Sequence, residues 1–120
     1  MANLNTIAMT KLSTSEGVDM KTVGNNSLYI VPSGKTGYIT HVIIRNPSAS
    51  MAGGTEYNFT NWKQSVDLSS LTTPETDFII LDTNNTKFQN LISNDSFEIS
   101  IATGTTSDCT VDIDVFGYLI

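Results

Sequence analysis

The sequence Asp108-Cys-Thr-Val-Asp-Ile-Asp-Val-Phe-Gly-Tyr-Leu-Ile120 decides the fold class of this chain. Four apolar residues alternate with three polar ones: Cys109, Val111, Ile113 and Val115 against Thr110, Asp112 and Asp114. In a β-strand, successive side chains point to opposite faces, so this segment has one apolar and one polar face. We therefore expect a strand that is paired within a sheet and that buries Cys109 in the core.

The segment before it, Ser96–Ala102, alternates in the same way. Its apolar residues are Phe97, Ile99 and Ile101, and its polar ones include Glu98 and Ser100. Thr103–Ser107 has the composition of a hairpin loop. The sequence thus predicts a β-hairpin over 96–120 that places Phe97, Ile99 and Ile101 beside Val111, Ile113 and Val115.

Further strand patterns occur along the chain, separated by turn residues such as Pro32-Ser33-Gly34-Lys35 and Asn46-Pro47. They are Leu28–Val31, Tyr38–Arg45, Glu56–Thr60, Gln64–Leu68 and Phe78–Leu81, while Lys87–Ile92 is ambiguous between a strand and a helical turn. Tyr38–Arg45 is apolar on both sides, which is typical of a central strand covered on both faces. With about seven or eight short strands and no convincing helix, the chain predicts an all-β fold, an antiparallel β-sandwich or jelly roll.

Residues 1–26 lack this regularity, and we predict an extended N-terminal arm there, followed by a β-sandwich domain over residues 27–120. Their apolar residues are isolated, and Gly17 and Gly24 interrupt any pattern. Three interpretations stay open: a disordered leader, an arm that packs on a neighbouring subunit, and a first strand of the domain itself. One short strand is expected between Val18 and Val23.

The composition excludes several classes of protein. Twelve acidic residues oppose six scattered basic ones, which gives a net charge of −6 and argues against a nucleic-acid partner. A single cysteine permits no intramolecular disulfide. No apolar run has the length of a membrane span, and residues 1–11 lack the pattern of a secretory signal. We therefore expect synthesis in a cytoplasm and no membrane partner.

Two motifs resemble catalytic or ligand sites only superficially. Ser33-Gly34-Lys35-Thr36 matches the end of a phosphate-binding loop, but Tyr29 stands where that loop needs glycine. We predict an ordinary turn. His41 is the only histidine, with neither a nucleophile motif nor enough other ligands for zinc, and we predict an ordinary strand residue.

The acidic residues of the last strand are a further candidate. Asp112 and Asp114 share its polar face, Glu98 is expected opposite them, and Asp95 and Asp108 flank the predicted hairpin. Clustered carboxylates can bind calcium or act as paired acids in glycosidases. The interpretations are a solvated face, salt bridges between subunits, or a metal or catalytic site. The first is preferred, so we predict no catalytic, cofactor-binding or metal residues and no cofactor.

Aromatic residues are the last candidate. Trp62, Tyr57, Phe59 and Tyr29 could form a platform for sugar rings, or they could pack in a core or an interface, which is the preferred interpretation.

The stretch from Leu28 to Ser50, with a Val-Pro-Ser-Gly turn and Tyr-Ile-Thr-His-Val-Ile-Ile-Arg-Asn-Pro, resembles small virion proteins of tailed bacteriophages. The closing Val-Phe-Gly-Tyr-Leu-Ile is similar to the ends of such chains. The resemblance covers residues 28–120 loosely and rests on structural turns and strands.

This resemblance implies a non-enzymatic structural protein of the virion, made in the host bacterial cytoplasm. The preferred function is a head decoration protein that binds and stabilises the major capsid shell. The alternative is a carbohydrate- or receptor-binding module associated with a fibre or the tail. The partners implied are the major capsid protein or neighbouring virion subunits, in a homo-oligomer, with a trimer favoured. We expect deletion of residues 1–24 to leave a folded domain that no longer binds its particle.

Overall fold

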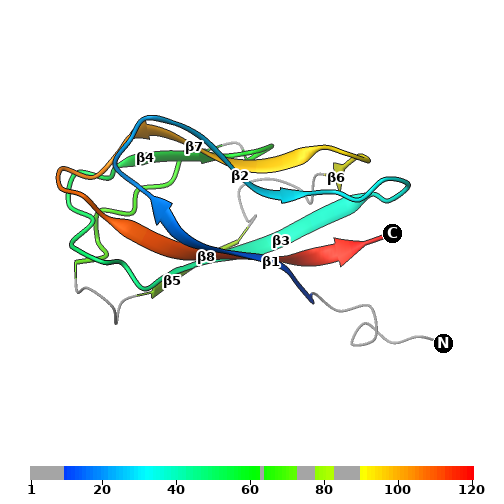
Figure 1. Ribbon diagram of the computed structural model, residues 1–120, viewed down its shortest axis with the longest axis horizontal. Coiled ribbons are helices and arrows are strands. Elements are labelled where there is room, and N and C mark those ends of the chain that lie inside the picture. The colour runs from blue at the N-terminus through cyan, green and yellow to red at the C-terminus, as the bar shows by residue number, and fades with distance from the viewer. Residues whose placement is uncertain (1–9, 63, 73–77, 83–89) are drawn as a thin grey trace.

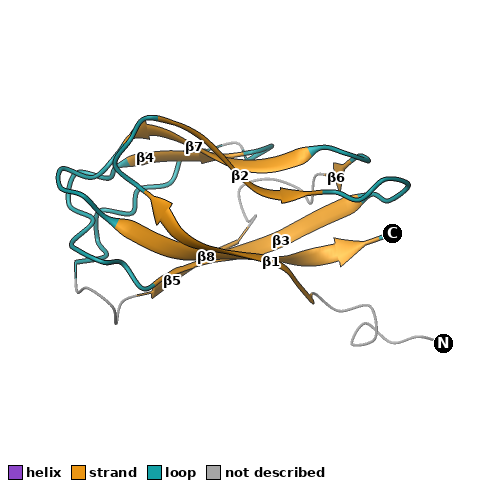
Figure 2. Ribbon diagram, viewed as in Figure 1, coloured by secondary structure: helices purple, strands orange, loops and turns teal. Residues whose placement is uncertain are grey.

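The structure is a computed structural model, and it describes residues 10–62, 64–72, 78–82 and 90–120. The described residues form strands and loops and contain no helix (Figure 2). In chain order the strands are β1 (Thr10–Asp19), β2 (Gly24–Ile30), β3 (Gly37–Arg45), β4 (Glu56–Phe59), β5 (Phe78–Asp82), β6 (Asn90–Leu91), β7 (Ser96–Thr103) and β8 (Thr110–Leu119).

These strands form two antiparallel sheets (Figure 1). The first sheet has the order β1-β8-β3-β5, with β6 also paired to β3. The second sheet has the order β2-β7-β4. The prediction of an all-β antiparallel fold is confirmed.

The core lies between the two sheets and is built from the alternating residues of their inner faces. β8 contributes Val111, Ile113 and Val115, β7 contributes Phe97, Ile99 and Ile101, and all six are buried. Cys109 is also buried, as predicted, and is a free thiol. Each fully buried side chain of this size contributes about 1.5–3 kcal/mol relative to exposure, so these residues account for a large part of the stability.

The predicted hairpin over 96–120 is wrong, although its apolar faces are right. β7 pairs with β2 and β4, whereas β8 pairs with β1 and β3. The connection between them crosses from one sheet to the other, and it is held by backbone hydrogen bonds from Thr105 to Met20 and from Thr106 to Ala52. The two apolar rows therefore face each other across the core and do not lie side by side in one sheet.

The predicted boundary at residue 26 also differs from the structure. Thr10–Asp19 is a strand of the first sheet, paired with β8, and Gly24 begins β2. Of the three interpretations, a strand of the domain itself holds for Thr10–Asp19, while residues 1–9 lie outside the described residues. Deletion of residues 1–24 would remove all of β1, so an arm can be tested only by deleting residues 1–9.

Three smaller predictions are refined. β3 is central, as predicted, but only its inner face is covered by a second sheet; outward-facing Ile43 is half-buried. Gln64–Leu68 forms a single bridge, between Val66 and Tyr57, in place of a strand. The ambiguous segment 87–92 contains the short strand β6, and residues 87–89 lie outside the described residues.

Candidate functional site

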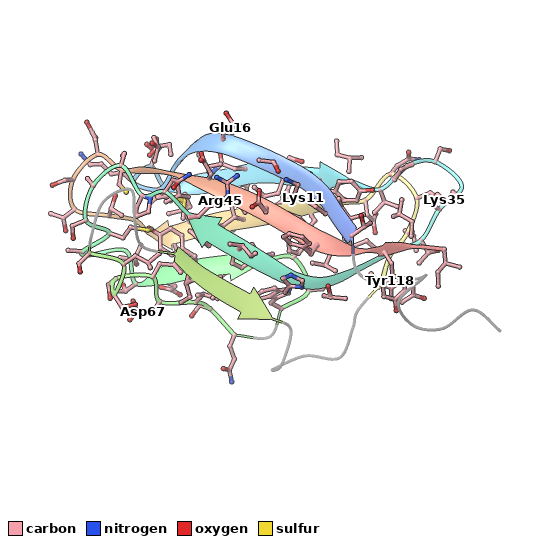
Figure 3. The ribbon with its side chains drawn as sticks, turned by 90° about the horizontal axis from the view of Figure 1, so that it is seen from below. Lys11, Glu16, Lys35, Arg45, Asp67 and Tyr118 are labelled. Atoms are coloured by element: carbon pink, nitrogen blue, oxygen red, sulfur yellow. The ribbon has the colours of Figure 1, made fainter. Side chains whose placement is uncertain are left out.

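The outer face of the first sheet carries the described residues best suited to a functional surface. Cross-strand neighbours on this face join β3 to β8, and they are Arg45 with Asp112, Ile43 with Asp114, His41 with Phe116 and Tyr38 with Tyr118. Figure 3 looks onto this face, with Arg45 over the middle of the sheet and Tyr118 toward the far end of β8. The face therefore has a charged region and an aromatic region.

The charged region is built around Arg45, at the last position of β3. Its Nε and Nη2 donate to the two carboxylate oxygens of Asp114 at 2.9 and 3.2 Å. Its Nη1 donates to Oδ2 of Asp112 at 3.2 Å. The planar guanidinium fork matches a carboxylate in this two-bond geometry, which makes the pair strong and directional. We call Arg45, Asp112 and Asp114 the charged cluster.

Neighbouring groups complete the charged cluster and join a third strand to it. The Thr14 hydroxyl on β1 donates to Oδ1 of Asp114 at 2.8 Å, and the backbone N–H of Gly17 donates to Oδ1 of Asp112 at 3.0 Å. Asn46, which follows β3 and has a φ of 55°, donates its side-chain N–H to Oδ2 of Asp112 at 3.0 Å. Asparagine tolerates this left-handed backbone better than most residues. The cluster thus ties β1, β8 and β3 together.

The electrostatics agree with these contacts. The hydrogen bond from Arg45 is the main cause that lowers the pKa of Asp114, and the hydrogen bond from Asn46 is the main cause that lowers the pKa of Asp112. The hydrogen bond to Asp114 raises the pKa of Arg45. All three groups are therefore charged over the whole range from mildly acidic to alkaline pH.

The hydrogen bonds to Asp112 and Asp114 favour a structural role for these carboxylates. Each of the four carboxylate oxygens accepts at least one hydrogen bond from Arg45, Thr14, Gly17 or Asn46, so the two charges are satisfied by partners on neighbouring strands. Within the described ranges, no group of three or more His, Cys, Asp or Glu side chains is placed to hold a metal ion. The charged cluster connects neighbouring strands and so stabilises the sheet.

The other predicted acidic residues do not join it. Glu98 lies on β7, in the second sheet, and therefore not opposite Asp112 and Asp114 as predicted. Asp108 is exposed and pairs with Lys21 at 3.4 Å, an interaction of the kind that adds little stability. Asp114 itself is only 6% exposed, so the solvated-face interpretation is wrong for this residue.

The aromatic region of the outer face consists of two stacked ring pairs on β3 and β8. The rings of Tyr38 and Tyr118 have centroids 4.9 Å apart and an interplanar angle of 12°. The rings of His41 and Phe116 are 4.5 Å apart at 7°. All four side chains are half-buried, so their outward ring faces form an apolar surface with polar atoms at its margin.

The remaining sequence candidates take ordinary structural roles. His41 is a strand residue, as predicted, and its Nδ1 lies 3.2 Å from the Thr40 hydroxyl. The phosphate-loop-like segment is a turn, in which Gly34 has a φ of 82° and the N–H of Lys35 donates to the Pro32 carbonyl at 3.1 Å. A type II turn requires such a φ at its third residue, and glycine adopts it without strain.

The aromatic residues considered for sugar binding do not form a platform. Tyr57 and Phe59 are buried in the core, and the Tyr57 hydroxyl donates to the Met20 carbonyl at 2.9 Å. Trp62 is half-buried and packs on Phe59, with ring centroids 4.7 Å apart. The core-packing interpretation is therefore the one that the structure supports.

Replacing Tyr57 with phenylalanine should remove part of the loss of stability at high pH. Burial raises the pKa of Tyr57 to about 12 from its usual value of 10.0. A group whose pKa is raised on folding stabilises the fold fully below its unfolded value and loses that contribution between about pH 10 and 12. Thermal melts from pH 7 to 11.5 should show a shallower alkaline decline for the variant, together with a cost of about 1 kcal/mol at pH 7 for the lost hydrogen bond. Parallel curves would contradict the assignment.

The outer face of the second sheet has a different character. Its cross-strand neighbours are Asn25 with Ser100, Ser27 with Glu98 and Asn58 with Ser100. These neighbours carry small hydroxyl and amide groups and one carboxylate, and Ile30, opposite Ser96 at the end of β2, adds an exposed apolar side chain. The outer face of the first sheet thus carries charged and aromatic side chains, whereas that of the second sheet carries mainly small polar ones.

With this geometry in place, the chain can be compared with known proteins. No protein-family model and no curated protein sequence matches it. A chain in the acidic stable capsid structure of Helicobacter pylori bacteriophage KHP30 matches with a TM-score of 0.51 and 14% identity, over 94% of this chain and 95% of its own length. A chain in the capsid asymmetric unit of cyanophage Pam1 matches with a TM-score of 0.53 and 12% identity, over 92% and 84%.

The chain has a fold found in phage capsids. At identities of 12% and 14%, this likeness is one of fold, and it assigns no residue a role. It agrees with the resemblance to phage virion proteins seen in the sequence, which rests on turns and strands of this same fold.

Sequence reasoning missed the residues that organise the outer face. Arg45 was visible as a basic residue at the end of an otherwise apolar strand, a position that calls for an acidic partner. That its partners are Asp112 and Asp114 depends on the pairing of β3 with β8, which no local pattern reveals. The Tyr38–Tyr118 pair depends on the same register.

Proposed function

We propose that this chain is a non-enzymatic structural protein of a tailed-bacteriophage virion, which decorates the head and stabilises the major capsid shell. The observation that carries the proposal is the match of nearly the whole chain to chains in the capsids of two phages. The acidic, disulfide-free composition suits a protein made in the host bacterial cytoplasm and incorporated into the particle.

We further propose that the two sheets form a jelly-roll sandwich. In support, the sheet β1-β8-β3-β5 faces the sheet β2-β7-β4, and successive strands from β1 to β5 alternate between the two sheets. The bridge between Tyr57 and Val66 adds a pairing at the free edge of β4, where a fourth strand of the second sheet would lie. Jelly rolls are a recurrent architecture of viral capsid domains. Because one fold serves many functions, the functional argument also needs a surface.

The outer face of the first sheet is the surface that we propose meets the capsid shell. Protein interfaces are enriched in tyrosine, phenylalanine and arginine and depleted in serine and glutamate. Tyr38, Tyr118 and Phe116 lie on this face, whereas Ser27, Ser100 and Glu98 occupy the opposite one. The second sheet would then face the solvent.

Imaging of purified particles at subnanometre resolution tests this function. We expect many copies of the chain arranged with the symmetry of the shell, each with its first sheet against the major capsid protein. A few copies at a fibre tip or in the tail would instead favour a receptor-binding module. Absence of the chain from particles would refute both.

We also propose self-association of the chain, with a trimer as the favoured state.

A further inference from the structure

Three large apolar side chains are exposed at one end of the domain. Ile30 is 59%, Ile92 is 62% and Ile120 is 70% exposed to solvent. Among the described residues, the other exposed large apolar side chain is Val23, at 67%. Val23 lies between β1 and β2, near the end of the first sheet at which β8 begins.

Hydrogen bonds connect the three isoleucines to a single segment, residues 31–36. Val31, next to Ile30, exchanges backbone hydrogen bonds with Asn94 and Asp95, in the turn that begins at Ile92. On the other side, Thr36 and Ile120 exchange two backbone hydrogen bonds, each of 2.9 Å. We call this part of the surface, defined by Ile30, Ile92 and Ile120, the isoleucine end.

The isoleucine end is a stronger candidate for a contact site than a single exposed apolar residue. Isolated apolar side chains are normal on a protein surface, but a group of them at one place marks a contact site. Covering such side chains removes apolar surface from water and so favours binding. Among the described residues of the two turns at this end, Lys35 and Asp95 are exposed and carry opposite charges, so an uncharged apolar segment suits this surface.

Residues 1–9, Met-Ala-Asn-Leu-Asn-Thr-Ile-Ala-Met, are such a segment. They contain no acidic or basic side chain, and their apolar residues include Leu4, Ile7 and Met9. β1 is antiparallel to β8, and its first residue, Thr10, pairs with Gly117. The chain therefore enters β1 at the end of the sheet where β8 reaches Ile120, which is the isoleucine end.

We propose that residues 1–9 of one copy bind the isoleucine end of a second copy. β1 begins at Thr10, at the isoleucine end, so residues 1–9 are attached to the domain at the surface that a neighbouring copy would meet. Nine extended residues span about 30 Å, enough to reach a neighbour across a domain whose shorter dimensions are 25 and 24 Å.

This inference rests on the proposed self-association and adds its contact. Because a segment of one copy meets a different surface on the next, the contact is heterologous, and such contacts form a ring when the rotation between copies closes and an open filament when it does not. A ring of three copies is compatible with the favoured trimer.

The molecular mass in solution provides the first test, by light scattering over a range of concentrations. We expect the full chain to be oligomeric. Deletion of residues 1–9 and the double substitution Ile92→Asn and Ile120→Asn should each weaken association at least tenfold. Val23→Asn is the matched control, since it alters an equally exposed side chain at the other end, and it should leave the mass unchanged. Circular dichroism establishes that each variant is folded.

Mixing the two impaired chains provides the decisive test. The deletion variant keeps the isoleucine end but lacks the segment, and the double variant keeps the segment but lacks the isoleucine end. Each alone should be monomeric, while the mixture should form a one-to-one complex. A mixture that stays monomeric, a deletion variant with the mass of the full chain, or a monomeric full chain would overturn the proposal.

These outcomes are separate from the test of the virion function. If the deletion variant is found on the heads of particles and the mixing experiment fails, the contact between residues 1–9 and the isoleucine end is refuted, while the proposed head decoration still holds. A successful mixing experiment with no copies on the particle would do the reverse.

Discussion

Replacing Ile113 with aspartate is expected to abolish the soluble, folded protein. Ile113 is fully buried at the middle of β8, with Ser15 of β1 and Ile44 of β3 as its cross-strand neighbours. The substitution removes about 1.5–3 kcal/mol of apolar burial. It also buries a carboxylate without a partner, at a cost of several kcal/mol. Together these costs are comparable with the whole stability of a domain, about 5–15 kcal/mol.

The matched control for this prediction is Val23→Asp, which introduces the same carboxylate at an apolar side chain that is 67% exposed and lies outside the isoleucine end. We expect the control to be recovered in the soluble fraction with a melting temperature near that of the unmodified chain. Ile113→Asp should be found in inclusion bodies or show no cooperative melt. A soluble Ile113→Asp protein with an unchanged melting temperature would show that the inner face of β8 has been assigned incorrectly.

The inner face of β8 could be predicted from sequence because it depends only on the two-residue period of a strand. The sheet partner could not. The five residues between Ala102 and Asp108 suit a hairpin and a crossover equally, and the choice is made by contacts with distant loops at Met20 and Ala52. Local patterns contain no information about those contacts.

β1 was predicted only as one of three interpretations of residues 1–26, for a different physical reason. Its register with β8 shifts twice, between Lys11 and Ser13 and between Ser15 and Val18. Each such irregularity inserts extra residues and moves the following side chains to the other face. Leu12 and Val18 therefore both pack on the core although no single period of two connects them to a continuous apolar row.

The charged cluster shows that an alternating pattern of residues can predict exposure wrongly. Asp112 and Asp114 alternate with apolar residues and so have the pattern of a solvated face. Asp114 is buried because Arg45, Thr14 and the sheet around them replace water as its hydrogen-bond partners. A buried charge is tolerated when it is paired and hydrogen-bonded, and these partners come from strands far away in the sequence.

Replacing Arg45 with methionine should therefore destabilise the domain strongly. The methionine keeps much of the apolar stem but leaves Asp114, 6% exposed, without its two-bond partner. Because the Arg45 side chain is 33% exposed, the pair is partly buried, and we expect a cost of about 2 kcal/mol, as for hydrogen bonds to a charged group. For a domain of this size, the melting temperature should fall by roughly 8 °C at pH 7.

The pH dependence distinguishes the lost ion pair from a general packing defect. Folding lowers the pKa of Asp114 from 3.8, chiefly through Arg45, so the pair stabilises the fold above about pH 4 and loses this contribution as the pH falls through the lowered pKa. The difference in melting temperature between the unmodified chain and Arg45→Met should thus be largest near neutral pH and shrink below pH 4. Lys21→Met, which removes the exposed pair with Asp108, is the control and should change the melting temperature little at any pH. A difference that stays constant down to pH 2.5 would mean that the stem of Arg45, and not its charge, holds β1, β8 and β3 together.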